Sequence, residues 1–404
     1  MVDIKAITEE YLGSLNYVKE IKRSIEITPS PDIVVVVGPR HAGKTFLMLK
    51  KVRELLDSGE QAAYVPFDDP ELHGLGPRDF AEAVRKSYPE GRVHIFLDEV
   101  QEWKGWDFNL RWLHDVKDFN IYASGSSSKL QSSEIPSKLR GRYISRVVLP
   151  LSFREIAGET EGTTFRERGA IGKLLDEYIR WGGFPEVWAY RSREKVISLV
   201  ETMFYRDIVE RHRVRDIEIF RNFMYFMLSN YSNNFTWHSL RRAVEFKGLK
   251  LDTKSIIKYA SYMQDAFMMF TIKRFSYSER ERMNSPKKAY LVDTSISSMF
   301  ESGSDLGRKI ENVVFVELMR RFPLNDIYYY VNSEGEEIDF LVRGPSTRLI
   351  EVTVDVDENH LRKVALAASE LGVKDAQIIS YNNANGEDRA TPLWKWLLGP
   401  IKPQ

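Results

Sequence analysis

The chain has 404 residues, more than one hydrophobic core usually organises, so we expect two to four domains. Its 58 basic and 58 acidic side chains leave no net charge, so any attraction to nucleic acid or a membrane surface must come from a local cluster. The absence of cysteine excludes disulfides, thiolate metal sites and a cysteine nucleophile. No apolar run approaches the roughly 20 residues of a membrane span, and the charged N-terminal segment lacks a signal-peptide pattern, so we expect a cytoplasmic protein with no membrane partner.

The first 150 residues alternate between helical and strand patterns. A helix is expected over 5–28, ended by Pro29 and Pro31. Short apolar or β-branched runs bounded by turn residues predict strands buried on both faces; they lie at 33–37, 62–67, 93–97, 121–123 and 144–149. Helical spacing separates them at 44–56, 77–88 and 108–116. This alternation predicts a parallel α/β sheet.

The pattern changes after Pro150. Residues 152–230 are predicted to be mostly helical, with a break at Trp181-Gly-Gly-Phe-Pro185. Three helices and then two strands are expected over 218–292. From Gly307 the expected order is a helix, three strands, a helix, a strand and a short helix.

Residues 38–45, GPRHAGKT, match the phosphate-loop pattern G-x-x-x-x-G-K-[ST] and lie between a predicted strand and a predicted helix. The glycines allow the backbone N–H groups to surround phosphates, and the helix adds its dipole. We expect Lys44 to reach the β- and γ-phosphates of ATP and the Thr45 hydroxyl to bind Mg²⁺. The residues assigned to ATP or ADP are Gly38, Pro39, Arg40, His41, Ala42, Gly43, Lys44, Thr45 and Phe46.

A second motif follows the apolar run 93–97, where Asp98 and Glu99 stand at the end of the predicted strand. Ligands bind at this edge of parallel sheets. Asp98 is expected to hold Mg²⁺ through water, and Glu99 to orient or deprotonate the attacking water. Phosphoryl transfer needs mainly positioning and charge neutralisation, so these few groups suffice. The two motifs together predict an ATPase.

Two further residues are weaker candidates for catalysis. Ser126, in the small-residue turn after the strand 121–123, could sense the γ-phosphate, although a plain turn is the alternative. Arg142, in Arg140-Gly-Arg142, could act as an arginine finger in its own chain or from a neighbouring subunit; the alternative is a surface arginine. A finger from a neighbour would require a homo-oligomer.

Six motifs follow one another along nearly the whole chain: GPRHAGKT, FLDEVQEWKGWDFNLRWL, SGSSSKL, LRGR, LPLSFREI and WGGFPEV. In this order they resemble a prokaryotic, mainly archaeal, family of AAA-type ATPases, whose members often carry a C-terminal domain related to restriction endonucleases. The resemblance implies an α/β AAA-like core (1–151), a helical lid (152–215), a winged helix (216–292) and a restriction-endonuclease-like domain (293–404). It also implies the roles given above to Lys44, Thr45, Asp98 and Glu99.

The residues of the expected winged helix are locally basic. Residues 236–246 and 253–264 predict a helix-turn-helix with Thr236 and Asp252 as N-caps, and residues 276–288 would form the wing. From 241 to 288 there are twelve lysines and arginines against five acids, which favours contact with DNA or RNA; packing against protein is the alternative. The candidate contacts are Arg241, Arg242, Lys254, Lys258, Lys287 and Lys288.

Residues 307–381 have the element order of a restriction-endonuclease core. Glu311 in the first helix, with Asp339 and Glu351 in two strands, could hold a second Mg²⁺; for the two strand acids the alternative is plain polar residues. The family pattern Glu-x-Lys ends here in Thr353, and Lys363 on the next helix could substitute for the missing lysine. We therefore expect binding or oligomerisation rather than cleavage.

The sequence thus supports an ATPase acting as a nucleic-acid-associated motor or switch. Two other functions stay open at this point: a nucleotide-controlled signalling switch without DNA, and an ATP-regulated, metal-dependent nuclease.

Overall fold

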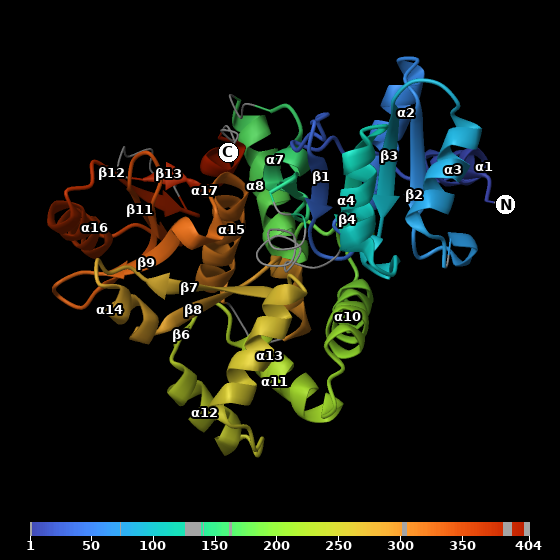
Figure 1. Cartoon of the computed structure of the whole chain (residues 1–404). Helices are drawn as coiled ribbons and strands as arrows, with labels where there is room; N and C mark the ends of the chain where they lie inside the picture. The colour runs from blue at the N-terminus through green and yellow to red at the C-terminus, as the bar shows by residue number, and fades with distance from the viewer. Residues whose placement is uncertain are drawn as a thin grey trace. The chain divides into compact units, whose positions relative to one another are not determined.

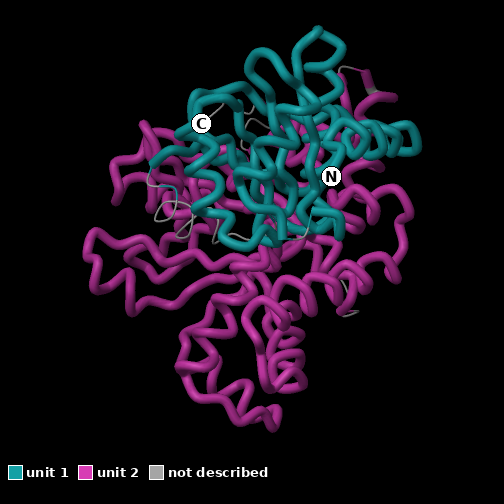
Figure 2. The backbone as a smooth tube through the Cα atoms, turned by 45° about the vertical axis from the view of Figure 1, so that its right-hand side comes forward, with its two compact units in different colours: residues 1–150 teal, residues 151–404 magenta. Residues whose placement is uncertain are grey.

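The computed structural model describes residues 2–72, 74–125, 139, 141–160, 164–300, 305–382 and 390–399. The chain divides into two compact units, residues 1–150 and 151–404 (Figure 2). No helix within the described ranges combines the length and the apolar character that crossing a membrane requires.

The described residues of the first unit form a five-stranded parallel sheet of order β2-β3-β4-β1-β5 (Figure 1). Its strands are β1 Ile33–Val37, β2 Ala62–Pro66, β3 Val93–Asp98, β4 Phe119–Gly125 and β5 Tyr143–Val147. The helices are α1 Ile4–Gly13, α2 Lys44–Asp57, α3 Pro77–Ser87 and α4 Trp106–Val116, with 3₁₀ turns η1 Ser14–Tyr17, η2 Pro70–Leu72 and η3 Val100–Glu102. The predicted parallel α/β sheet is confirmed, and β1 lies inside it, between β4 and β5.

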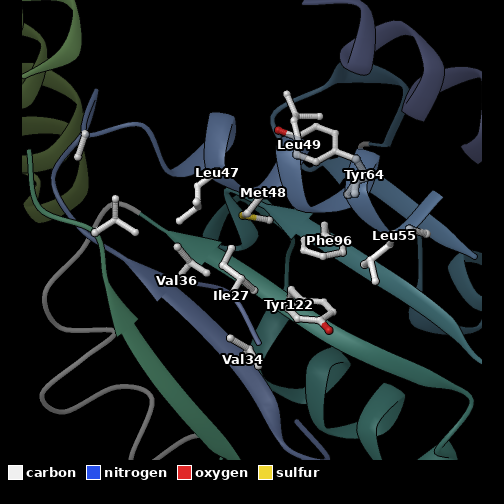
Figure 3. Packing of buried hydrophobic residues seen from close by; sticks show 14 residues of the cluster. Ile27, Val34, Val36, Leu47, Met48, Leu49, Leu55, Tyr64, Phe96 and Tyr122 are labelled. Carbon is white, nitrogen blue, oxygen red and sulfur yellow. The ribbon is translucent and has the colours of Figure 1, made fainter. Parts of the chain in front are cut away.

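Helix α2 packs on one face of this sheet. Leu47 and Met48 of the helix are buried with Val36, Phe96 and Tyr122 of three strands (Figure 3). The three strand residues share this face because alternate residues of a strand point to opposite sides. This packing of the apolar side of α2 on the sheet holds the first turn of the helix in place, directly after the phosphate loop.

The predicted helix over 5–28 is wrong beyond its first half. Helix α1 ends at Gly13, η1 ends at Tyr17, and no regular helix follows before β1. Ile25 and Ile27 of the remaining segment both join the core cluster under α2. Residues two apart share a side in an extended chain but not in a helix, so their burial requires the extended form.

The second unit begins with helices α7 Phe153–Ala157, α8 Phe165–Trp181, α9 Pro185–Tyr190, α10 Arg193–Thr202, the π-helical η4 Met203–Glu210 and α11 Ile217–Ser229. It continues with β6 Asn234–Phe235, α12 Trp237–Phe246, α13 Thr253–Asp265, β7 Met269–Arg274, α14 Glu279–Asn284, β8 Lys287–Leu291 and η5 Thr294–Met299. The last elements are α15 Leu306–Arg321, η6 Leu324–Asp326, β9 Ile327–Val331, β10 Glu337–Val342, β11 Arg348–Thr353, α16 Glu358–Leu371, β12 Asp375–Ser380, β13 Thr391–Pro392 and α17 Leu393–Leu398.

Within the described part of this unit the strands form one mixed sheet of eight, in the order β13-β12-β11-β10-β9-β7-β8-β6 (Figure 1). Strand β7 pairs antiparallel with β8 and parallel with β9. The sheet is therefore continuous across the domain boundary predicted between residues 292 and 293. The segment expected to be a wing contains the short helix α14, which Ser278 caps by accepting from the Glu281 N–H.

The break predicted around Trp181–Pro185 has a steric cause. A Cβ on Gly183 would lie 1.9 Å from the Leu151 carbonyl oxygen, and one on Gly182 would lie 1.7 Å from Asp293 Oδ1. The Gly183 N–H also donates to Asp293 Oδ2 at 2.7 Å. Only glycine fits at both positions, so this turn anchors the end of α8.

Candidate functional site

The phosphate loop connects β1 to α2, and both glycines of its motif are required by the backbone. Gly38 has φ +155°, and a Cβ there would lie 2.0 Å from the Val148 carbonyl oxygen. Gly43 has φ +92° and stands at the N-cap of α2. The left-handed backbone at Gly43 turns the chain into the helix, whose first N–H groups are left for a ligand.

Lys44 is only 5% exposed and its ammonium lies on its own loop. Nζ donates to the carbonyl oxygens of Gly38 at 3.1 Å and Pro39 at 3.0 Å. These oxygens are neutral, and an ammonium binds an anionic oxygen about twice as strongly. A phosphate in the loop would therefore compete well for this lysine.

Asp98 ends strand β3, is 2% exposed, and accepts several hydrogen bonds. Its Oδ2 accepts from Thr45 Oγ1 at 2.6 Å and from the Tyr64 hydroxyl at 2.6 Å. Its Oδ1 accepts from Ser124 Oγ and from the Glu99 N–H, the latter at 3.1 Å. The structure thus brings together Thr45 and Asp98, the two residues predicted to hold Mg²⁺.

The contacts that Tyr64 and Ser124 make with Asp98 were not predicted from the sequence. Tyr64 is the only hydroxyl-bearing residue of the apolar strand β2, and Ser124 stands near the end of β4. Strands β2 and β4 both lie beside β3, so the contacts of Tyr64 and Ser124 with Asp98 follow once the strand order is known. Burial, and then the Asp98 carboxylate, raise the pKa of Tyr64, which keeps it a neutral donor.

Glu99 follows Asp98 with a left-handed backbone, φ +48° and ψ +47°. Its side chain accepts from Gln101 Nε2. Burial raises the pKa of the Glu99 carboxyl above its ordinary 4.5, while the nearby Lys44 ammonium opposes the rise. A carboxylate with a raised pKa is a stronger base, which suits the predicted role toward water.

The structure does not place the other two catalytic candidates, Ser126 and Arg142, at this site. Ser126 and Arg140 lie outside the described residues. Arg142 precedes β5, and its carbonyl accepts from the Ile33 N–H at the start of β1. The phosphate loop leaves the opposite end of β1, five residues or roughly 16 Å away. An arginine finger from Arg142 to the site of its own chain is therefore wrong, and its side chain instead lies 3.5 Å from Asp115.

Most of the predicted nucleic-acid contacts lie at the surface. Thr236 and Asp252 are the N-caps of α12 and α13, as predicted. The exposed or half-exposed residues on these helices are Arg241, Arg242, Lys254 and Lys258. Lys287 of β8 is partly buried, with Nζ 5.4 Å from the centre of the Trp237 ring. Lys288 is buried, so its predicted contact with phosphate is wrong.

Lys288 instead meets the acids predicted to bind a second Mg²⁺. Its Nζ lies 2.7 Å from Glu311 Oε1 and 3.2 Å from Asp339 Oδ1. Glu351 pairs separately with Lys363, at 2.6 Å. Burial raises the pKa of Glu311 to about 8. Among the described residues no group of three or more histidines or acids is arranged to hold a metal ion, so these residues do not fit the predicted second Mg²⁺.

Comparison with known proteins gives three family matches along the chain. Residues 30–157 match the family model of an AAA domain. Residues 172–306 and 306–396 match two domains of unknown function, DUF8612 and DUF4143. The fold and the matches define an α/β protein with an AAA domain, a nucleotide-binding class, followed by a unit with a mixed sheet.

The chain is 30% identical to the uncharacterized protein MJ1544 of Methanocaldococcus jannaschii, over 98% of this chain and 96% of that protein. It therefore belongs to the same family as MJ1544. An uncharacterized protein of Haemophilus influenzae is 25% identical over 85% of this chain and 87% of its own length. The expected AAA-type core and prokaryotic relatives are confirmed; the link to restriction endonucleases stays a prediction.

Among solved structures, the Aeropyrum pernix ORC2 protein in its ADPNP–ADP complexes covers 78% of this chain and 92% of its own, at 10% identity. The TM-score is 0.38, too low for an inference about function.

Proposed function

We propose that the protein binds ATP with Mg²⁺ in the phosphate loop, hydrolyses it, and uses this cycle as a motor or switch on nucleic acid. The observation that carries the first part is the 2.6 Å contact between Thr45 Oγ1 and Asp98 Oδ2. It joins the end of the phosphate loop to the end of β3 through the two side chains that would share the magnesium.

Each residue of the site has a distinct task in this proposal. The loop N–H groups and Lys44 bind the phosphates, and Thr45 and Asp98 hold the ion. Mg²⁺, when bound, offsets the charge that develops on the phosphate oxygens. Glu99 orients the attacking water and takes its proton. The Asp98 charge is available to a cation because its side-chain partners, Thr45, Tyr64 and Ser124, are neutral hydroxyls.

The proposed nucleic-acid contact rests on the basic segment, residues 236–288. Helices α11, α12 and α13 together with the antiparallel strands β6, β8 and β7 have the order of a winged helix. Arg241, Arg242, Lys254 and Lys258 are exposed or half-exposed on α12 and α13, where phosphate could reach them.

The ATPase is tested with four proteins, each measured for ATP binding and for ATP hydrolysis. We expect wild type to bind and hydrolyse Mg-ATP, Lys44→Ala to lose both, and Glu99→Gln to bind ATP without turning it over. Lys50→Ala is the matched control, because Lys50 lies on the same helix and pairs with Glu20. Normal hydrolysis by Glu99→Gln would contradict the role given to that residue.

The nucleic-acid part is tested by adding duplex DNA at increasing salt. We expect turnover to rise with DNA and the effect to fall steeply with salt, since phosphate contacts release counterions. Lys254→Glu/Lys258→Glu should weaken binding and lower the salt slope by about 2. The control is Lys374→Glu/Lys395→Glu, which reverses the charge of two exposed lysines outside the basic segment. Turnover that ignores both DNA and salt would favour a signalling switch instead.

A further inference from the structure

Lys288 of strand β8 holds a charge in the interior of the second unit. The residue is 4% exposed. Its Nζ lies 2.7 Å from Glu311 Oε1, 2.7 Å from Glu337 Oε1 and 3.2 Å from Asp339 Oδ1. An ammonium has three N–H donors, so these three carboxylates use its full capacity. We call these four residues the Lys288 cluster.

The members of the Lys288 cluster come from elements that are not adjacent in the sheet. Glu337 and Asp339 belong to β10, which β9 and β7 separate from β8. Asn234 of β6 also donates to Glu337, to its Oε2. The sheet must therefore curl so that its β8–β6 edge meets β10 across the interior. The lysine holds this curl together.

The other carboxylate oxygens around this point are mostly in use. Glu311 Oε1 also accepts from the Tyr290 hydroxyl at 2.6 Å, and Asp339 Oδ2 accepts from the Val352 N–H at 2.9 Å. Lys363 binds Glu351 Oε1 at 2.6 Å and also donates to the Glu337 carbonyl at 2.9 Å. Glu351 Oε2 is buried and has no hydrogen-bond partner among the described residues.

Mg²⁺ does not fit this arrangement. The ion needs near-octahedral oxygen coordination at about 2.0–2.1 Å and keeps several waters, and it requires room between its carboxylates. Here an ammonium fills the space between Glu311 and Asp339 and already cancels part of their charge. A divalent ion placed beside it would meet a fixed positive charge at close range in the interior, where screening is weak. Glu351 Oε2, which has no hydrogen-bond partner among the described residues, is one oxygen and cannot replace the lost ligands.

We propose that Lys288 is a built-in cation that takes the place of the divalent metal implied by the resemblance to restriction endonucleases. The second unit then binds no Mg²⁺ or Mn²⁺ at Glu311 and Asp339 and does not cleave nucleic acid. The lysine instead ties β8, and with it the basic segment, to the C-terminal strands. This proposal does not depend on the ATPase proposal, because it concerns other residues in the other unit.

The first test uses the intact chain in the absence of nucleotide. Mn²⁺ is the probe, and its binding is measured by electron paramagnetic resonance. Wild type and Asp339→Asn should bind the same amount of Mn²⁺, and neither should nick a supercoiled plasmid with Mn²⁺ or Mg²⁺. Mn²⁺ binding or plasmid nicking by wild type that disappears in Asp339→Asn would overturn the proposal.

The second test removes the cation with Lys288→Met, whose unbranched side chain is one atom shorter and carries no charge. If this variant folds, as judged by circular dichroism, it should gain one Mn²⁺ site that Lys288→Met/Asp339→Asn lacks, and Mn²⁺ should raise its Tm. Lys287→Met, the adjacent position on β8, should gain no Mn²⁺ site. A folded Lys288→Met that gains no Asp339-dependent site would count against the proposal. If the variant does not fold, the wild-type comparison with Asp339→Asn decides the question.

Discussion

Lys44 in the phosphate loop and Lys288 in β8 are both almost completely buried, but their partners differ in kind. Lys44 donates to two neutral backbone carbonyls of its own loop. Lys288 lies against three carboxylates from two other elements. A phosphate bound in the loop would offer the first lysine a stronger acceptor, whereas moving the second would deprive Glu311, Glu337 and Asp339 of their shared counter-charge.

The aspartates of the two sites, Asp98 and Asp339, differ in a similar way. Asp98 is held by hydroxyl groups, which orient the carboxylate but leave its charge. Asp339 is held by an ammonium, which orients it and cancels its charge. The comparison teaches that the donors around a carboxylate decide whether a metal can enter, more than the number of acids does.

The largest effect is expected for Glu99→Gln, which tests whether the first site is built for turnover. Loss of the group that takes the proton from water should lower the ATPase rate by about 10²–10⁴-fold while ATP binding is kept. Single-turnover kinetics with a filter-binding measurement on the same sample separates the two effects. A rate within threefold of wild type would contradict the assignment.

The next largest effect is a loss of stability in Lys288→Met. Removing one partner of a buried ion pair leaves uncompensated charge, which costs about 3–5 kcal/mol. Urea unfolding followed by fluorescence should show this loss in the second unit, with Lys287→Met close to wild type. An equal loss in both variants would mean that the position on β8 matters rather than the buried charge.

A smaller effect is expected for Tyr64→Phe, which removes the hydroxyl that donates to Asp98 and that also meets the Thr45 side chain. Groups that orient a metal ligand typically contribute about 10-fold or more to affinity. We therefore expect the Mg²⁺ concentration for half-maximal turnover to rise about 10-fold. Tyr122→Phe is the control, because Tyr122 lies on the same sheet face but bonds His94, at 3.0 Å. Unchanged Mg²⁺ dependence in Tyr64→Phe would contradict this role.

The smallest effect is a shift in pH dependence. Because burial raises the Glu99 pKa, the carboxylate takes up a proton at a higher pH than an exposed glutamate does. Activity should therefore fall, as pH is lowered, through a midpoint above the ordinary 4.5. The profile of kcat/KM against pH reports this free-enzyme value. A midpoint at or below 4.5 would show that the charges of Lys44 and Arg40 outweigh burial.

The sequence was sufficient for features that depend on neighbours along the chain. The β-branched run 33–37 predicts a buried strand, the motif 38–45 predicts the loop, and Thr236 and Asp252 predict helix starts. Each follows from local backbone chemistry, and the structure has all of them.

Features that depend on the order of strands or on the curl of a sheet could not be predicted from the sequence. The contact of Tyr64 with Asp98 requires β2 to lie beside β3, and the buried place of Lys288 requires β8 to meet β10. The local excess of basic residues predicted that Lys288 contacts nucleic acid, because a count of charges does not show which side chains are buried. The position of Arg142 was a different kind of miss: in a parallel sheet, a residue that precedes a strand lies at the edge away from the loop.

Calorimetric titration with a non-hydrolysable ATP analogue, with and without Mg²⁺, tests the central claim most directly. We predict that wild type binds the analogue and that Mg²⁺ strengthens the binding. We also predict that Lys44→Ala loses affinity by about 100-fold or more, since it removes the one ammonium aimed at the phosphates. A wild-type protein with no Mg²⁺-dependent affinity for ATP or GTP analogues, or a Lys44→Ala protein that binds as wild type does, would contradict this claim.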